Sequence, residues 1–189
     1  MHLHSVPMQE KLQQLARRID TLSELTGRAV AWLTLATVSV TFAVVVLRYV
    51  FQTGSIALQE SVSYLHAAVF MLGAAYTLKH DAHVRVDIFY SRMTQRGKAW
   101  INLAGSLLLL LPVCLFILFA SLEYTGNAWS VLEGSQEAGG LDAVFLLKTL
   151  IPVMAMLLLL QGIALCLHSI LRLSGVPADT ADTGPDHEL

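Results

Sequence analysis

Charged residues are scarce in this chain of 189 residues. Asp, Glu, Lys and Arg together make up 14% of the sequence, whereas hydrophobic residues make up 55%. An ordinary soluble domain contains about 25% charged residues, so this composition excludes that class and indicates a polytopic membrane protein. The net charge is −2, and the acids and bases lie in separate segments. No basic stripe is left for nucleic acid, and we predict no nucleic-acid partner.

Motifs for catalysis and cofactor binding are also missing. The sequence contains no phosphate-binding loop, no dinucleotide-binding glycine motif and no His-Glu-x-x-His zinc motif. Both cysteines, Cys114 and Cys166, lie in apolar runs, where they behave as small hydrophobic residues. We therefore predict no enzyme activity, no catalytic residue, no metal site and no cofactor. No cleavable signal peptide is visible, because the first apolar run starts after Arg28 and is too long for one.

Four long runs are almost free of charge and predict an all-α fold with four transmembrane helices. The predicted spans are residues 29–50, 58–79, 98–122 and 149–171. Each is long enough to cross a hydrocarbon core of ~30 Å at ~1.5 Å per residue. Thr94 is predicted to cap the start of the third span. Pro112, in the third run, should remove one backbone hydrogen bond and bend that helix.

The basic residues predict the orientation of these spans. Five of the twelve Lys and Arg residues lie in segment 79–98, between the second and third spans. Four more precede the first span and one follows the fourth, whereas only Arg48 and Lys148 fall on the opposite side. Basic connectors stay in the cytoplasm, so we predict that both termini are cytoplasmic.

The two ends of the chain differ from the spans. Residues 1–27 are predicted to hold a cytoplasmic amphipathic helix, since apolar residues recur at steps of three and four. These residues are Met8, Leu12, Leu15, Ile19 and Leu22. The helix either lies among lipid headgroups or packs on protein, and both interpretations stay open. Residues 28–172 form the predicted membrane domain, and residues 173–189 have the composition of a disordered cytoplasmic tail.

Polar residues inside the spans are few. Every Asp, Glu, Lys and Arg lies at or beyond a predicted span end, so this chain is not expected to carry a substrate through its own four helices. His66 and His168 differ in depth by ~20 Å, which is too far for one haem to bridge. Gln161, in the middle of the fourth span, is interpreted as an interhelical hydrogen bond.

Two features mark the predicted outer side. Arg48 and Glu60 flank one short turn, and an ion pair between them is the simplest interpretation, with partner docking as the alternative. Segment 123–148 holds four acids and one base, and Gly139-Gly140 predicts a turn within it. It is either a solvated loop or a docking surface for a basic partner, and the sequence leaves open whether it is helical.

These motifs, in this order, resemble the small membrane subunit of tripartite ATP-independent periplasmic (TRAP) transporters. The resemblance rests on Arg48-Tyr49-Val50-Phe51, Glu60, Gly73-Ala74-Ala75-Tyr76 and His83-Val84-Arg85-Val86-Asp87. One subgroup is also similar in Glu133-Gly134-Ser135, Gly139-Gly140-Leu141, Lys148, Pro152 and Gln161. The match spans roughly residues 28–172.

The resemblance implies a non-catalytic, multi-pass subunit of the bacterial inner membrane, surrounded by membrane lipid. Its partners would be a large TRAP permease subunit and a periplasmic substrate-binding protein, in a sodium-driven uptake system for organic acids. The residues expected to act in docking or as scaffold are Arg48, Glu60, Gly73, His83, Arg85, Asp87, Glu133, Glu137 and Lys148. A self-contained loop brace is the alternative role for His83, Arg85 and Asp87. The rival functions are a membrane anchor of a respiratory oxidoreductase and a free-standing small channel or exporter.

Overall fold

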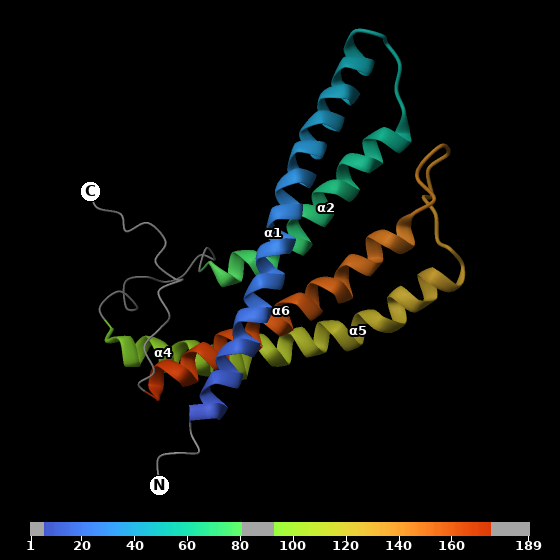
Figure 1. Cartoon of the computed structure of the whole chain (residues 1–189). Helices are drawn as coiled ribbons and strands as arrows, with labels where there is room; N and C mark the ends of the chain where they lie inside the picture. The colour runs from blue at the N-terminus through green and yellow to red at the C-terminus, as the bar shows by residue number, and fades with distance from the viewer. Residues whose placement is uncertain (1–5, 81–92, 175–189) are drawn as a thin grey trace, which may run out of the picture.

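The computed structural model describes residues 6–80 and 93–174, and all regular structure in these residues is helical (Figure 1). The elements in order are α1 (Val6–Tyr49), α2 (Ile56–Lys79), α4 (Gln95–Gly105), a π-helical turn η1 (Ser106–Leu110), α5 (Leu111–Ser130) and α6 (Val144–Leu173). Four helical stretches are long and apolar enough to cross a membrane. The predicted all-α fold with four membrane-spanning helices is therefore confirmed.

Helix α1 is one continuous helix of 44 residues, about 66 Å long at 1.5 Å per residue. The predicted boundary at residue 27 is not a break, because only Gly27 weakens the helix there and no proline interrupts it. The apolar face predicted for residues 1–27 is only partly buried: Ile19 is buried, whereas Met8 and Leu15 are exposed. The buried face of this segment also includes Ala16 and Ser23.

The third span consists of α4, η1 and α5. Thr94 caps α4, as predicted, by accepting a hydrogen bond from the Gly97 amide at 3.2 Å. Pro112 lies in the first turn of α5. Just before it, the Leu111 amide donates to the Ser106 carbonyl, five residues back, which is the hydrogen bond of a π-helix. The irregularity expected at Pro112 therefore takes the form of a π-helical turn.

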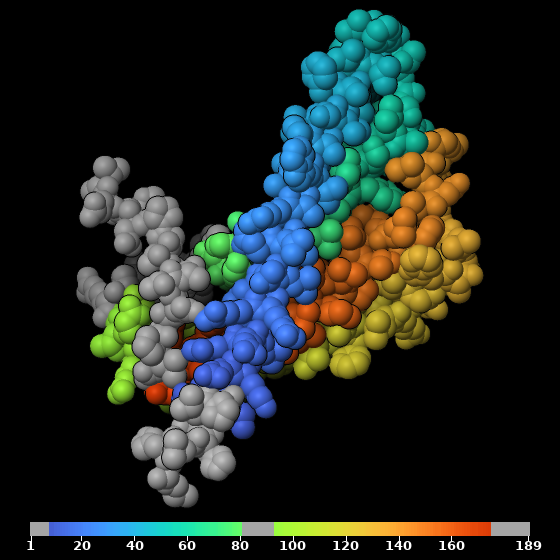
Figure 2. Space-filling view, in the orientation of Figure 1, coloured from blue at the N-terminus to red at the C-terminus, as the bar shows by residue number. Residues whose placement is uncertain are grey.

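Helix α6 is the centre of the bundle and contacts α1, α2, α4, η1 and α5. Helices α1 and α2 form one hairpin and α5 and α6 form another, and the two hairpins diverge toward their loops (Figure 1). The tip of the α1–α2 hairpin projects beyond the α5–α6 pair (Figure 2). Buried positions are mostly small, which lets helix backbones approach closely. The buried alanines are Ala16, Ala75, Ala99, Ala128, Ala155 and Ala164.

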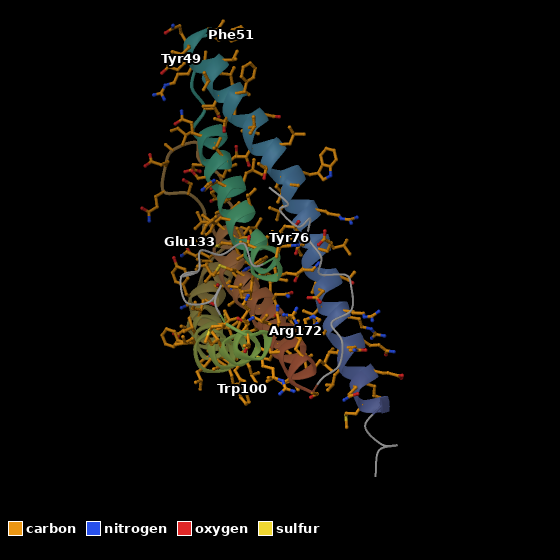
Figure 3. All side chains as sticks on the ribbon, turned by 90° about the vertical axis from the view of Figure 1, so that its left-hand side faces the viewer. Tyr49, Phe51, Tyr76, Trp100, Glu133 and Arg172 are labelled. Atoms are coloured by element: carbon orange, nitrogen blue, oxygen red, sulfur yellow. The ribbon has the colours of Figure 1, made fainter. Side chains whose placement is uncertain are left out.

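The bundle has two ends, named here for what they contain. The hairpin end holds loops 50–55 and 131–143. The terminus end holds the start of α1, the end of α2, the start of α4 and the end of α6 (Figure 1). Tyr49 and Phe51 mark the hairpin end, and Trp100 and Arg172 lie far from them at the terminus end (Figure 3). The predicted tail lies outside the described residues, except for its first two positions, 173 and 174.

Candidate functional site

Glu60, in the second turn of α2, fixes the loop 131–143 to that helix. Its Oε2 accepts a hydrogen bond of 2.6 Å from the Leu141 amide, and its Oε1 accepts one from the Ser135 hydroxyl. Ser55 starts α2 by capping the Leu58 amide at 3.4 Å. One carboxylate therefore joins α2 to a loop that lies more than seventy residues away along the chain.

The loop also folds on itself around glycines. The Ser135 amide donates to the Leu141 carbonyl, and the Gly140 amide donates to the Glu137 carbonyl, both at 3.0 Å. Gly139 has a φ of +82°, which favours glycine. A Cβ at Gly140 would lie 2.8 Å from Glu60 Oε2, so a side chain there would displace the carboxylate. The turn predicted at Gly139-Gly140 is confirmed.

A second connection joins the loop to α5 and α6. Lys148 Nζ lies 2.5 Å from Glu133 Oε2 and 4.0 Å from the centre of the Tyr124 ring. Nearby, the Trp129 indole donates to the Thr149 hydroxyl at 2.8 Å. We call Glu60, Glu133, Ser135, Leu141 and Lys148 the hairpin-end clamp.

The expected ion pair between Arg48 and Glu60 is wrong. Within the described residues no ion pair joins these side chains, because Ser135 and Leu141 occupy the two Glu60 oxygens. Arg48 is exposed at the end of α1. Three acids near the clamp, Glu123, Glu137 and Asp142, are exposed as well. Segment 123–148 is helical at its two ends and a loop between them, since α5 continues to Ser130 and α6 begins at Val144.

Gly73 faces α1, since a Cβ built on it would lie 3.6 Å from Val30 Cγ1. Its place in this structure is thus the α1–α2 contact, and a role for Gly73 with a partner stays a prediction. The other predicted residues of the basic loop, His83, Arg85 and Asp87, lie outside the described residues.

At the terminus end, a polar network that the sequence analysis missed joins α1 to α6. Asp20 accepts from Gln161 Nε2 at 3.0 Å and lies 2.8 Å from His168 Nε2. The Ser23 hydroxyl donates to Gln161 Oε1 at 2.6 Å, and both of these side chains are buried. The interhelical hydrogen bond predicted for Gln161 is confirmed. Asp20 escaped notice because it belongs to a segment interpreted as amphipathic, yet Ala16, Asp20 and Ser23 share one helix face, and that spacing was a usable signal.

Glu24 makes a matching connection between α1 and α2. It lies 2.8 Å from Lys79 Nζ, 3.2 Å from His80 Nε2 and 3.8 Å from Arg28 Nε. Both ends of the bundle therefore have interhelical polar contacts. No cluster of three potential metal-ligating side chains occurs in residues 6–80 and 93–174.

A comparison with models of known protein families identifies the family of this chain. The family model described as tripartite ATP-independent periplasmic transporters, DctQ component, matches residues 37–173. Comparisons with curated proteins and with solved structures found no match. The matched range covers the last part of α1, from residue 37, and all later described helices, so it includes the hairpin-end clamp but not Asp20 or Glu24. The chain thus belongs to the DctQ family and is the small permease subunit of a TRAP transporter.

Proposed function

We propose that this subunit is a scaffold for a large permease subunit and a docking surface for a periplasmic substrate-binding protein, in sodium-coupled uptake of a carboxylate or related small solute. In this proposal the hairpin end faces the periplasm and both chain termini face the cytoplasm. The distribution of Lys and Arg supports that orientation, because basic segments remain on the cytoplasmic side. Sodium coupling and the substrate class rest on the family resemblance.

The hairpin-end clamp is the observation that carries the docking role. It ties loop 131–143 to α2 through Glu60 and to α6 through Lys148. A loop held at two points loses little conformational entropy when a partner binds. The exposed acids around it, Glu123, Glu137 and Asp142, offer negative charge for a basic surface on that partner.

The placement of charge along the helices supports a scaffold role. Asp20 already interacts with Gln161 and His168 of α6. The exposed positions of α6 from Leu146 to Ile170 are all apolar, and the exposed base Arg172 lies in its last turn. Transport through a helix bundle needs polar or ionisable groups along the route. We therefore assign substrate and ion binding to the large subunit.

The assembly is tested by tagging the C-terminus in native membranes, solubilising gently and identifying the proteins that co-purify. We expect a large polytopic permease in near-equal amount and no Soret absorption band. Haem-containing soluble subunits would instead establish the respiratory anchor, and a chain without any partner would favour the free-standing channel.

The docking role needs a separate measurement on the purified complex. Replacing Glu123, Glu137 and Asp142 with their amides should weaken binding of the periplasmic protein and reduce the dependence of its association rate on salt, since exposed charges act mainly on that rate. The matched control is Glu10→Gln, which removes an exposed acid at the terminus end. Equal binding by the triple variant and the control would contradict docking at this surface.

A further inference from the structure

The exposed residues of α2 lie in one narrow row. They are Ile56, Gln59, Ser63, His66 and Phe70, and the steps between them are three, four, three and four residues. The remaining faces of α2 pack against α1 and α6 within the chain. Steps of three and four are the spacing with which one helix presents a seam to a single neighbouring helix. We call this row the α2 seam; at ~1.5 Å per residue it is about 21 Å long.

The middle of the α2 seam is polar. His66 lies ten residues after Ile56, the first residue of α2, and thirteen before Lys79, the last. It is therefore close to the middle of a membrane-spanning helix. Within the described residues, Gln59, Ser63 and His66 have no side-chain hydrogen-bond partner. Lipid chains offer none, so leaving these groups in hydrocarbon is unfavourable.

The exposed side chains of α1 and α6 differ from those of the α2 seam. On α1, the exposed hydroxyls of Thr34, Ser39 and Thr41 each donate to the carbonyl four residues earlier, at 3.0, 2.9 and 2.7 Å. Such groups are satisfied without a partner and tolerate lipid. Before its last turn, which holds the exposed Arg172, the exposed residues of α6 are Leu146, Val153, Met156, Ile163 and Ile170. These surfaces are suited to hydrocarbon, whereas the α2 seam is not.

We propose that the α2 seam seats one membrane-spanning helix of the large permease subunit, and that this helix places a carboxyl or amide side chain opposite His66. The inference rests on the proposed function and adds the contact face and its chemistry. A protein helix can supply hydrogen-bond donors and acceptors at this depth, and lipid chains cannot. A second copy of the same chain fits less well, because two-fold pairing through the seam would set His66 against His66.

The contact face is tested by photo-cross-linking in native membranes. A benzophenone amino acid is placed at position 66 and, as a matched control, at position 39 of α1. Ser39 is also exposed, lies ten residues before Tyr49 at the end of its helix, and has a satisfied hydroxyl. We expect a covalent product with the large permease subunit from position 66 and none from position 39.

The alternative outcomes separate this inference from the proposed function. If the wild-type chain co-purifies with the permease but position 66 gives no product with it, the seam is wrong and the function stands. A product with a second copy, or equal products from positions 66 and 39, also overturns the seam. If the wild-type chain captures no permease at all, the proposed function fails, and the inference fails with it.

The hydrogen bond is tested by substitution at the same position. His66→Leu should reduce the recovery of the complex on the order of tenfold, which corresponds to about 1.4 kcal/mol and is the scale of one intramembrane hydrogen bond. His66→Gln keeps donor and acceptor groups and should restore most of the recovery, and Ser39→Leu should change nothing. Membrane levels of each variant are measured to exclude failed insertion. Full recovery with His66→Leu would overturn a hydrogen-bonding role for His66.

Discussion

The ring of Tyr76 on α2 lies directly against the α-carbon of Gly27 on α1. A Cβ built at Gly27 would lie 2.7 Å from Tyr76 Cε2, closer than any ordinary contact. The same ring packs beside His80, with 4.4 Å between ring centroids. Gly27 is therefore needed for the close approach of α1 and α2 near Glu24 and its partners at the terminus end.

Gly27→Ala should destabilise the subunit by about 1–3 kcal/mol, because the methyl group forces the Tyr76 ring to move. Thermal unfolding of the purified protein in detergent measures the effect. Gly126→Ala is the matched control: Gly126 is also helical, but no atom lies within 4 Å of a Cβ there. That variant should be neutral or slightly more stable, since alanine favours helix. Equal losses from both variants would contradict a specific contact at Tyr76.

Glu60→Gln should loosen loop 131–143, because the charged acceptor for the Leu141 amide is lost. Hydrogen exchange at Leu141 should become faster, on the order of tenfold, while exchange within α6 stays unchanged. Arg48→Gln separates the two interpretations of Glu60. If the carboxylate acts on the loop, this variant leaves exchange at Leu141 unchanged; an ion pair with Arg48 would make both variants alike.

Lys148→Met should lower the thermal stability of the subunit, because the half-buried Glu133 carboxylate loses its partner. Adding Glu133→Gln should restore part of the loss, since it removes the unpaired charge. A double-mutant cycle on Tm measures this coupling. If the two losses simply add, Lys148 and Glu133 act independently, and their role lies with a partner.

Asp20→Ala should detach the first part of α1 from α6 and cost about 1–3 kcal/mol, because Gln161 and His168 are left without their acceptor. Asp20→Asn keeps an acceptor and should cost less. Amide exchange in residues 8–28, compared with that in α5, reports the change. Glu10→Ala removes an exposed acid from the same helix and should have no effect. A loss from Glu10→Ala as large as that from Asp20→Ala would point to net charge as the cause.

The sequence was sufficient for the parts of the fold that depend on local pattern. Long uncharged runs located four spanning helices, Thr94 marked a helix start, and Gly139-Gly140 marked a turn. Contacts between distant segments were harder. Arg48 is near Glu60 in sequence, yet Glu60 bonds to Leu141, 81 residues away. Nothing in the local pattern around Glu60 indicates which way a carboxylate turns when a distant loop offers a free amide.

The environment of Asp20 is a second feature that the sequence pattern did not predict. Charged residues in an amphipathic segment are normally solvated, so the pattern predicts that Asp20 faces water. Its partners are instead Gln161 and His168 of α6, each more than 140 residues away along the chain. The interpretation of Gln161 as an interhelical hydrogen bond was correct, because an amide in an apolar span finds few hydrogen-bond partners other than polar groups on neighbouring helices. Only the structure shows that its hydrogen-bond partners are Asp20 and Ser23.

The lengths of the helices have a consequence for the surrounding bilayer. The stretch Gln95–Ser130 has 36 residues, about 54 Å, against a hydrocarbon thickness of ~30 Å. Such a stretch must either tilt strongly or extend well into the headgroup regions. Because the two hairpins diverge (Figure 1), they cannot both stand upright in one flat membrane. The tilt of the α5–α6 pair should therefore depend on the acyl-chain length of the surrounding lipid. Thicker bilayers favour a more upright pair, and thinner ones favour a more inclined pair.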